Sequence, residues 1–427
     1  MRLRITRVAL AVGVALMLGF YAELAVHAPA TGQDLRIFYA AATTLREGGN
    51  PYDAGQLLRV EERLYHPRDA AARASLAGNP YVQGPPLAIA LLPLTGRAPA
   101  AVYHGEALLL VLAAVAAVIV LARGSPALST AHASRRALIL LISPVTFLGV
   151  LLGQPDALLL LLLVAALSLY RRHALLAGFI LALGLVKPQI MAGPLLLCGL
   201  LAWRRGRVAP YAMGALGGAL LFLGGSAAIA GPAVVTGWLR ELAGFSGATV
   251  YTQVDISSLS TLYVGWAPHA LSLLLAVAGL AAWTTLCVKR PRATEPGNED
   301  QTSARNATAG EPGEHWWFLL GLAGWLLVTP YAHPHDDILL LPAAWYLLER
   351  GPYRGRAALI AVLLVLSWWL LPMTSLLGLR PPLLRGLGVI PVALTFALLA
   401  TRRPAAATGA ATTGLPNRAI GSHRIAL

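Results

Sequence analysis

The sequence predicts an all-α polytopic membrane protein, and two observations support this fold class. The first is composition: 57% of the 427 residues are hydrophobic and only 12% are charged, whereas a soluble domain has about 25% charged residues. The second is that apolar blocks of membrane-spanning length recur from end to end. The net charge of +14 therefore indicates arginine at one side of a membrane, and no binding of nucleic acid is expected.

The apolar blocks and the arginines between them predict the topology. Arginine and lysine gather at alternate junctions, such as Arg171-Arg172 and Lys289-Arg290, and are sparse at the others. By the positive-inside rule, the arginine-rich junctions and both termini are cytoplasmic. About twelve transmembrane helices are expected, at residues 8–26, 101–122, 137–152, 155–170, 174–187, 188–203, 209–230, 265–287, 316–331, 337–349, 357–372 and 386–401.

The predicted organisation is one transmembrane domain over residues 1–403, followed by a disordered cytoplasmic tail over 404–427. Residues 27–100 form an extracytoplasmic loop with surface helices. Residues 290–315 are polar and low in aromatic residues, which is typical of a linker, here on the cytoplasmic side. The first block, 8–26, is interpreted as a retained anchor, although it also resembles a signal peptide.

Residues 31–52 carry the leading candidate for catalysis. From Leu35 the apolar positions recur at helical spacing, and Gly48-Gly49 followed by Asn50-Pro51 ends the predicted helix. Asp34 lies at the N-terminal end of this helix. It fits an N-cap, and it also fits a general base, because a helix N-terminus stabilises the ionised carboxylate that a base needs.

Lys187 lies between two apolar blocks and is one of only two lysines in the chain. A cation at membrane level that faces protein is by default a functional-site candidate, and the alternative is a snorkelling lysine at the interface. The segment Gly153-Gln154-Pro155-Asp156 predicts a tight turn between two spans. In that interpretation Asp156 caps the helix that follows Pro155.

The segment His333-Pro334-His335-Asp336-Asp337 precedes another span on the same side. Two histidines and two aspartates so close could bind a metal. However, Pro334 and the spacing of the histidines direct the side chains apart, and no further ligand cluster is evident, so no metal site is predicted. Binding of phosphate or of an acceptor, and a helix cap at Asp336, are the remaining interpretations. Cys198 and Cys287 both fall in apolar blocks and indicate neither a disulfide framework nor a metal site.

The polar side chains of the outer side together suit an anionic, hydroxyl-rich ligand. A carboxylate can take a proton from a hydroxyl, and cations can stabilise a leaving phosphate, which are the requirements of glycosyl transfer from a lipid phosphate. The predicted site has Asp34 as the catalytic base, Lys187, Arg36 and His335 as donor-phosphate ligands, and Gln83, Gln154, Gln189, His333, Asp336 and Asp337 as substrate-binding residues.

The order of these motifs resembles the class C membrane glycosyltransferases, and most closely glycosyltransferase family 87. That family includes mannosyltransferases that use polyprenyl-phosphate-mannose to extend phosphatidylinositol mannosides. The resemblance implies a class C architecture, with Asp34 as the base and Lys187 near the donor phosphate. One departure is His335-Asp336, where a Tyr-Asp pair is expected. The resembling pieces are Asp34 with Phe38-Tyr39-Ala40-Ala41, Gly49-Asn50-Pro51-Tyr52, Tyr81 with Pro85-Pro86-Leu87, Gly153-Gln154-Pro155-Asp156, Lys187-Pro188-Gln189, and residues 335–340.

The expected protein is therefore a multi-pass enzyme of the plasma membrane with an extracytoplasmic active site. It transfers a hexose, with mannose the expected sugar, from a polyprenyl-phosphate donor to a lipid-linked or glycan acceptor, and needs no cofactor. Two other classes stay open. A transporter or flippase of a lipid-linked sugar would use the same charges without turnover and would have internal repeats. A membrane scaffold would not need these charges at one depth.

Overall fold

The structure is a computed structural model that describes residues 33–77, 80–123, 140–141, 143–244, 277–279, 312–329, 332–349 and 389–400. Within these ranges every regular element is a helix, as predicted. The predicted spans at 8–26 and 357–372 and the tail lie outside the described residues, and so do residues 290–311 of the linker and all of 265–287 except 277–279. The predicted number of transmembrane helices therefore stays a prediction. Residues 312–315, the end of the predicted linker, instead begin helix α16.

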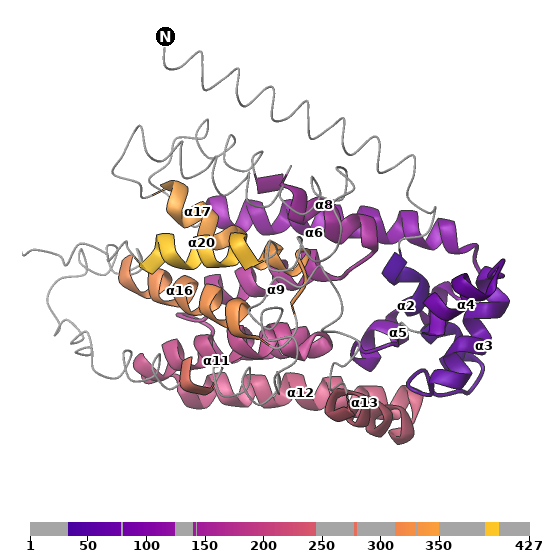
Figure 1. Cartoon of the computed structure of the whole chain (residues 1–427). Helices are drawn as coiled ribbons and strands as arrows, with labels where there is room; N and C mark the ends of the chain where they lie inside the picture. Colours follow the sequence, from indigo (N-terminus) through magenta and orange to yellow (C-terminus); the bar gives the residue numbers. More distant parts are fainter. Residues whose placement is uncertain are drawn as a thin grey trace, which may run out of the picture.

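The described helices form two groups (Figure 1). The long helices run side by side as a bundle, and a compact group of short helices lies at one end of it, called here the α2–α5 end. The elements of this end are α2 (Gln33–Arg46), α3 (Ala54–Tyr65), α4 (Ala70–Ala77), α5 (Pro85–Leu91) and η1 (Leu92–Leu94). The remaining elements are α6 (Pro99–Arg123), α8 (Pro144–Leu152), α9 (Asp156–Leu169), α10 (Ala174–Leu183), η2 (Gly184–Val186), α11 (Pro188–Arg204), α12 (Val208–Ala230), α13 (Pro232–Gly244), α16 (Pro312–Val328), η5 (Asp336–Leu340), α17 (Leu341–Glu349) and α20 (Val389–Ala400).

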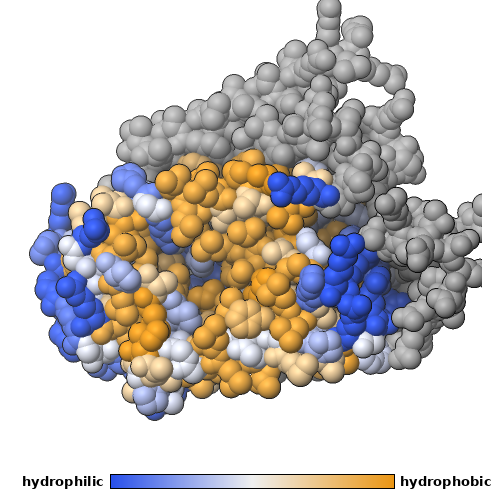
Figure 2. Space-filling model, turned by 180° about the vertical axis from the view of Figure 1, so that it is seen from behind, coloured by the Kyte–Doolittle hydropathy of each residue, from blue (hydrophilic) through white to orange (hydrophobic). Residues whose placement is uncertain are grey.

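The surface of the bundle has the polarity of a membrane protein. Figure 2 shows a broad hydrophobic belt with hydrophilic residues at both of its ends. Among the described helices, α6 and α12 are long and apolar enough to cross a membrane. Both helices expose leucines along their length, including Leu108 and Leu112 on α6 and Leu216 and Leu220 on α12. Such a large exposed apolar surface is the kind that faces lipid or another protein.

Helices α10 and α12 approach each other closely because glycines line their contact. A Cβ on Gly214 would lie 1.8 Å from the carbonyl oxygen of Leu175, and one on Gly218 would lie 2.7 Å from that of Phe179. Gly214 and Gly218 are four residues apart and so share one face of α12. Small residues at this spacing allow the backbones of membrane helices to pack directly.

Helix α2 is the centre of the α2–α5 group and follows the predicted helical spacing. Its side chains from Ile37 to Ala42 are all buried, because α3 and α5 both pack against it. The helix is therefore more enclosed than its amphipathic pattern predicts. Tyr81 contacts two other rings of this group, with centroid distances of 6.1 Å to Phe38 and 5.3 Å to Tyr52.

Glu61 lies on the buried face of α3 together with Leu57 and Val60. Burial raises the pKa of its carboxyl from 4.5 to about 7, because a low-dielectric environment disfavours the charged form. The folded protein therefore holds this proton to a higher pH than the unfolded chain does. The resulting stabilisation is fully present below pH 4.5 and is lost as the pH rises through about 7.

We expect Glu61→Gln to raise the unfolding temperature at about pH 8, where wild-type Glu61 is ionised, and to change it little at about pH 4.5. Thermal unfolding of the detergent-solubilised protein at both pH values measures this difference. Glu62→Gln is the matched control, because Glu62 pairs with the exposed Arg73 instead of being enclosed. An equal gain at both pH values would contradict the assignment.

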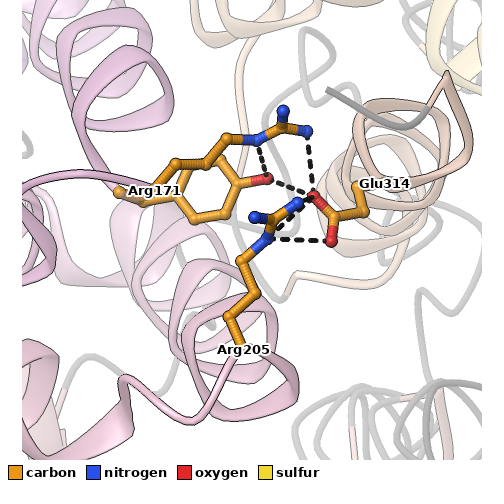
Figure 3. A network of polar contacts seen from close by, with 4 residues as sticks. Arg171, Arg205 and Glu314 are labelled. Atoms are coloured by element: carbon orange, nitrogen blue, oxygen red, sulfur yellow. Dashed lines mark hydrogen bonds and ion pairs between the residues drawn. The ribbon is translucent and has the colours of Figure 1, made fainter. Parts of the chain in front are cut away.

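The opposite end of the bundle, called here the arginine end, is held by a network around Glu314 (Figure 3). Its carboxylate accepts hydrogen bonds from Arg171 at 2.9 Å and from Arg205 at 2.8 Å, and a further one from the Tyr170 hydroxyl at 2.7 Å. The network joins the end of α9, the end of α11 and the start of α16. It therefore connects three helices that are distant in sequence.

Glu314→Gln is expected to destabilise the protein far more than Glu47→Gln. Each hydrogen bond to a charged group contributes about 1.5–3 kcal/mol, and the Glu314 side chain is only 12% exposed. Glu47 pairs with Arg63, and both of these side chains are about half exposed, so that pair is worth about 0–1 kcal/mol. Unfolding temperatures in detergent compare the two variants, and equal losses would rule out a stabilising role of the network.

Candidate active site

Asp34 lies in the first turn of α2 and is half-buried. Its carboxylate oxygen Oδ2 accepts a hydrogen bond of 2.6 Å from Nε2 of Gln154, which is 120 residues further along the chain. Because α2 begins at Gln33, Asp34 lies within the first turn rather than before it. The helix dipole and the amide of Gln154 both favour an ionised carboxylate at this place.

The turn over residues 153–156 positions Gln154. Gly153 ends α8 in the left-handed conformation, with φ of 73°, and the Gln154 N–H then donates to the Gly149 carbonyl at 2.8 Å. A Cβ on Gly153 would lie 2.7 Å from Cβ of Leu35 and 3.0 Å from Oε2 of Glu106. The predicted turn is confirmed, and it lies directly against the start of α2.

Gly153→Ala is therefore expected to lower activity by at least about tenfold, because misplacing a catalytic group by about 1 Å can reduce the rate up to about 10²-fold. The alanine would push Leu35, the neighbour of Asp34, away from the turn. Gly206→Ala is the matched control: Gly206 has φ of 68° but no atom within 4 Å of a new Cβ. Both variants carry the same strain of about 1–2 kcal/mol for a left-handed residue, so equal activities would show that the contact with Leu35 is unimportant.

Glu106 is a second carboxylate near Asp34 that the sequence interpretation missed. It lies on α6, a helix of otherwise apolar character, and Asp34 acts on it electrostatically. Its Oε2 atom is buried and has no hydrogen-bond partner among the described residues. An isolated acid inside an apolar span is itself a signal for a functional site, and that signal was available in the sequence.

Lys187 lies in a buried ion-pair cluster. Its ammonium donates to Oδ1 of Asp156 at 2.6 Å and to Oδ1 of Asp336 at 3.0 Å. The three side chains are at most 2% exposed. Lys187 thus faces protein, as the sequence predicted, and it is not a snorkelling lysine. The prediction that Asp156 caps α9 is wrong: the N-cap position is Pro155, and Asp156 is the first residue of the helix. Its side chain pairs with Lys187 instead.

The two histidines lie next to this cluster, with their rings stacked at a centroid distance of 5.0 Å. Nε2 of His335 lies 3.8 Å from Oδ2 of Asp156 and 4.0 Å from Oδ2 of Asp336. The backbone N–H of His333 donates to Oδ2 of Asp336 at 2.8 Å. The expectation that Pro334 directs the two histidine side chains apart is therefore wrong. The fold also brings His335 and Asp336 together with Asp156.

The other predicted residues lie around these two groups or beside them. Gln83 is buried, and the next residue, Gly84, donates its N–H to the carbonyl of Val186 at 2.9 Å, so this segment lies against Lys187. Arg36 stacks over the ring of Tyr65, with its guanidinium 5.3 Å from the ring centroid. Gln189 is half-buried, and its carbonyl accepts hydrogen bonds from Trp325 and Thr329. Asp337 is buried at the start of η5.

The turn at 153–156 joins the two groups of the site. Gln154 holds Asp34, and Asp156, two residues later, holds Lys187. The carboxylate of α2 and the charged cluster of α9, η2 and η5 therefore meet at one end of the bundle. This arrangement places a candidate base beside a strongly charged, water-poor environment, in which electrostatic interactions are strong.

These features define the class: a membrane protein whose described part is all-helical, with a polar and charged site at one end of the bundle. The sequence model of glycosyltransferase family 87 matches residues 81–302, more than half of the chain. The chain belongs to glycosyltransferase family 87, as the order of motifs predicted, and it is a membrane glycosyltransferase. The matched range includes the turn at 153–156 and Lys187, while Asp34 precedes it and His335 follows it. No curated protein and no solved structure matches the chain.

Proposed function

We propose that this glycosyltransferase moves a hexose, with mannose as the proposed sugar, from a polyprenyl-phosphate donor to a lipid-linked or glycan acceptor. The observation that carries the proposal is the pairing of Asp34 with Gln154 beside the Lys187 cluster. A single carboxylate held in place suits the activation of an acceptor hydroxyl. The resemblance of the motif order to family members that use polyprenyl-phosphate-mannose supports the choice of donor.

In the proposed reaction, Asp34 accepts the proton of the acceptor hydroxyl as the oxygen attacks the anomeric carbon of the donor. The bond from that carbon to the phosphate oxygen breaks, and polyprenyl phosphate leaves with the bonding electrons. A single displacement of this kind inverts the anomeric centre. Gln154 orients the base, because its amide donates a hydrogen bond to Oδ2 of the Asp34 carboxylate.

The donor phosphate needs positive charge, and Arg36 and Lys187 are the candidates that could supply it. Arg36 follows Asp34 by two residues on α2 and is half-buried, so we propose it as a direct phosphate ligand. Lys187 is neutralised by Asp156 and Asp336, so we propose that it acts on the donor indirectly, by fixing these two carboxylates and His335. The amides of Gln83, Gln154 and Gln189 and the polar groups of His333, Asp336 and Asp337 remain proposed substrate contacts.

We further propose that the α2–α5 end faces the extracytoplasmic side of the plasma membrane. The support is the charge distribution: Arg171, Arg205 and the neighbouring Arg172, Arg204 and Arg207 all belong to the arginine end, and such residues favour the cytoplasm. Both termini are then cytoplasmic.

Purified protein incubated with polyprenyl-phosphate-[¹⁴C]mannose and membrane lipid extract tests the proposal. We expect time-dependent transfer of label to a lipid or glycan product. A flippase would move the donor between leaflets of a vesicle and release no polyprenyl phosphate, so absence of product together with donor translocation would replace our proposal with the transporter. Mass spectrometry of cell-envelope lipids with and without the gene identifies the natural acceptor.

A further inference from the structure

The two aspartates that hold Lys187 each place one oxygen atom on the lysine and the other on the side of His335. Both Oδ1 atoms accept from the Lys187 ammonium, at 2.6 Å for Asp156 and 3.0 Å for Asp336. Both Oδ2 atoms face Nε2 of His335, at 3.8 Å and 4.0 Å. These last distances are too long for hydrogen bonds, so a gap remains among three buried polar atoms.

Oδ2 of Asp156 provides the second observation that indicates a ligand site here. The side chain of Asp156 is only 1% exposed, and its Oδ2 has no hydrogen-bond partner among the described residues. Leaving a charged oxygen buried and unsatisfied is strongly unfavourable, by several kcal/mol. The atom points to the same gap that His335 and Asp336 border.

The net charge of the cluster also favours the binding of a cation. Asp156 and Asp336 carry two negative charges when ionised, and Lys187 supplies one positive charge. One negative charge remains in a place from which solvent is excluded. Buried charges in proteins are paired or coordinate a metal.

The geometry of the three atoms fits a metal ion. One ligand atom from each of Asp156, His335 and Asp336 can be chosen so that all lie within 4.8 Å of one another. Ligands of one zinc ion are about 3–4 Å apart, because each is about 2.0–2.2 Å from the metal. The two distances from Nε2 of His335, 3.8 Å to Asp156 and 4.0 Å to Asp336, already lie in this range.

We propose that Asp156, His335 and Asp336 bind one divalent transition-metal ion of the Zn²⁺ or Mn²⁺ class. One imidazole and two carboxylates are a ligand set that such ions accept, whereas Mg²⁺ and Ca²⁺ prefer oxygen alone. Lys187 then lies outside the ligand shell and orients both carboxylates through their Oδ1 atoms. Hydrogen bonds of this kind to ligating carboxylates are usual around bound metals.

The sequence disfavoured a metal because it offered His333, His335, Asp336 and Asp337 without a further ligand cluster. The fold supplies that ligand from α9: Asp156 precedes Asp336 by 180 residues and is brought to it across the Lys187 contact. With an ion bound, the group carries one net positive charge, which suits an anionic ligand. This last consequence rests on the proposed function, whereas metal binding itself does not.

The test uses full-length protein in detergent, stripped of metal with a chelator and titrated with Co²⁺, which gives visible absorption bands when bound by nitrogen and oxygen ligands. We expect saturation at about one Co²⁺ per chain, with displacement by Zn²⁺. His335→Ala and Asp156→Asn should each weaken Co²⁺ binding by at least about 100-fold, since even outer-shell changes reduce metal affinity by about 10- to 100-fold. His104→Ala, at an exposed position on α6, should bind as the wild type does.

Two results would overturn the proposal. One is a wild-type protein that shows no saturable Co²⁺ binding up to millimolar concentration. The other is a His335→Ala variant that is folded by gel filtration and binds Co²⁺ as tightly as the wild type. Either variant suffices to place the ion, so the test stands if only one of them folds. No sugar donor is present in these titrations, so their outcome is independent of whether the proposed transfer reaction occurs.

Discussion

Asp34→Asn is expected to insert and bind donor normally and to transfer sugar about 10²- to 10⁴-fold more slowly than the wild type. That range is the usual effect of removing a general base. The substitution isolates the base, because an asparagine oxygen can still accept the hydrogen bond from Gln154 that Oδ2 of Asp34 accepts now. The α2 helix therefore keeps its contact with the turn at 153–156, and only the ability to take a proton is lost.

Asp53→Asn is the matched control for this experiment. Asp53 caps α3, with its Oδ1 accepting the N–H of Gln56 at 2.9 Å, and asparagine caps a helix about as well as aspartate. We expect that variant to keep wild-type turnover in the same transfer assay. Substantial activity of Asp34→Asn would assign the base to another carboxylate, and Glu106 is then the first candidate because Asp34 acts on it electrostatically.

Lys187→Met is expected to be the most destabilising single substitution at this end of the bundle. It leaves the carboxylates of Asp156 and Asp336 buried without the ammonium that both contact. Breaking a buried ion pair by removing one partner typically costs about 3–5 kcal/mol. We expect a lower unfolding temperature in detergent and a reduced yield of folded protein.

The double variant Lys187→Met/Asp156→Asn tests the cause. Neutralising Asp156 removes one of the two charges that Lys187 compensates, so part of the lost stability should return. Lys187→Arg should restore the charge but not the fit, because a larger, planar guanidinium must enter a site that is only 2% exposed. If Lys187→Met alone unfolds at the wild-type temperature, the ammonium does not stabilise the cluster and a direct role at the donor phosphate becomes the better explanation.

Local signals in the sequence were sufficient to predict many of the helices. The apolar runs predicted α6, α9, α11 and α12 to within a few residues, because a helix that faces lipid must be apolar over its length. Gly48-Gly49 predicted the end of α2, and Gly153 predicted the turn after α8. In each case the determining chemistry lies within a few neighbouring residues.

The sequence also indicated which residues were candidates for the functional site. Lys187 stood out because a lysine between two apolar blocks needs a reason, and Asp34 because it opens a helix on the polar side. The same reasoning applied to Glu106 would have found it within the apolar run of α6. The glycines of α10 and α12 did not indicate their role in the sequence, because that role is to let two particular helix backbones approach closely.

Only the tertiary structure showed which residue each charged side chain of the site pairs with. Gln154 meets Asp34 across 120 residues, and Lys187 meets Asp156 and Asp336 across 31 and 149 residues. No local pattern encodes such pairings, because a buried charge is stabilised by whichever opposite charge the packing of the helices brings within about 3 Å. The sequence by itself predicted the membrane class of this chain and the candidate residues of its site. The packing of α2, α9, η2 and η5 decided that Asp34 is held by an amide and that Lys187 is held by two carboxylates.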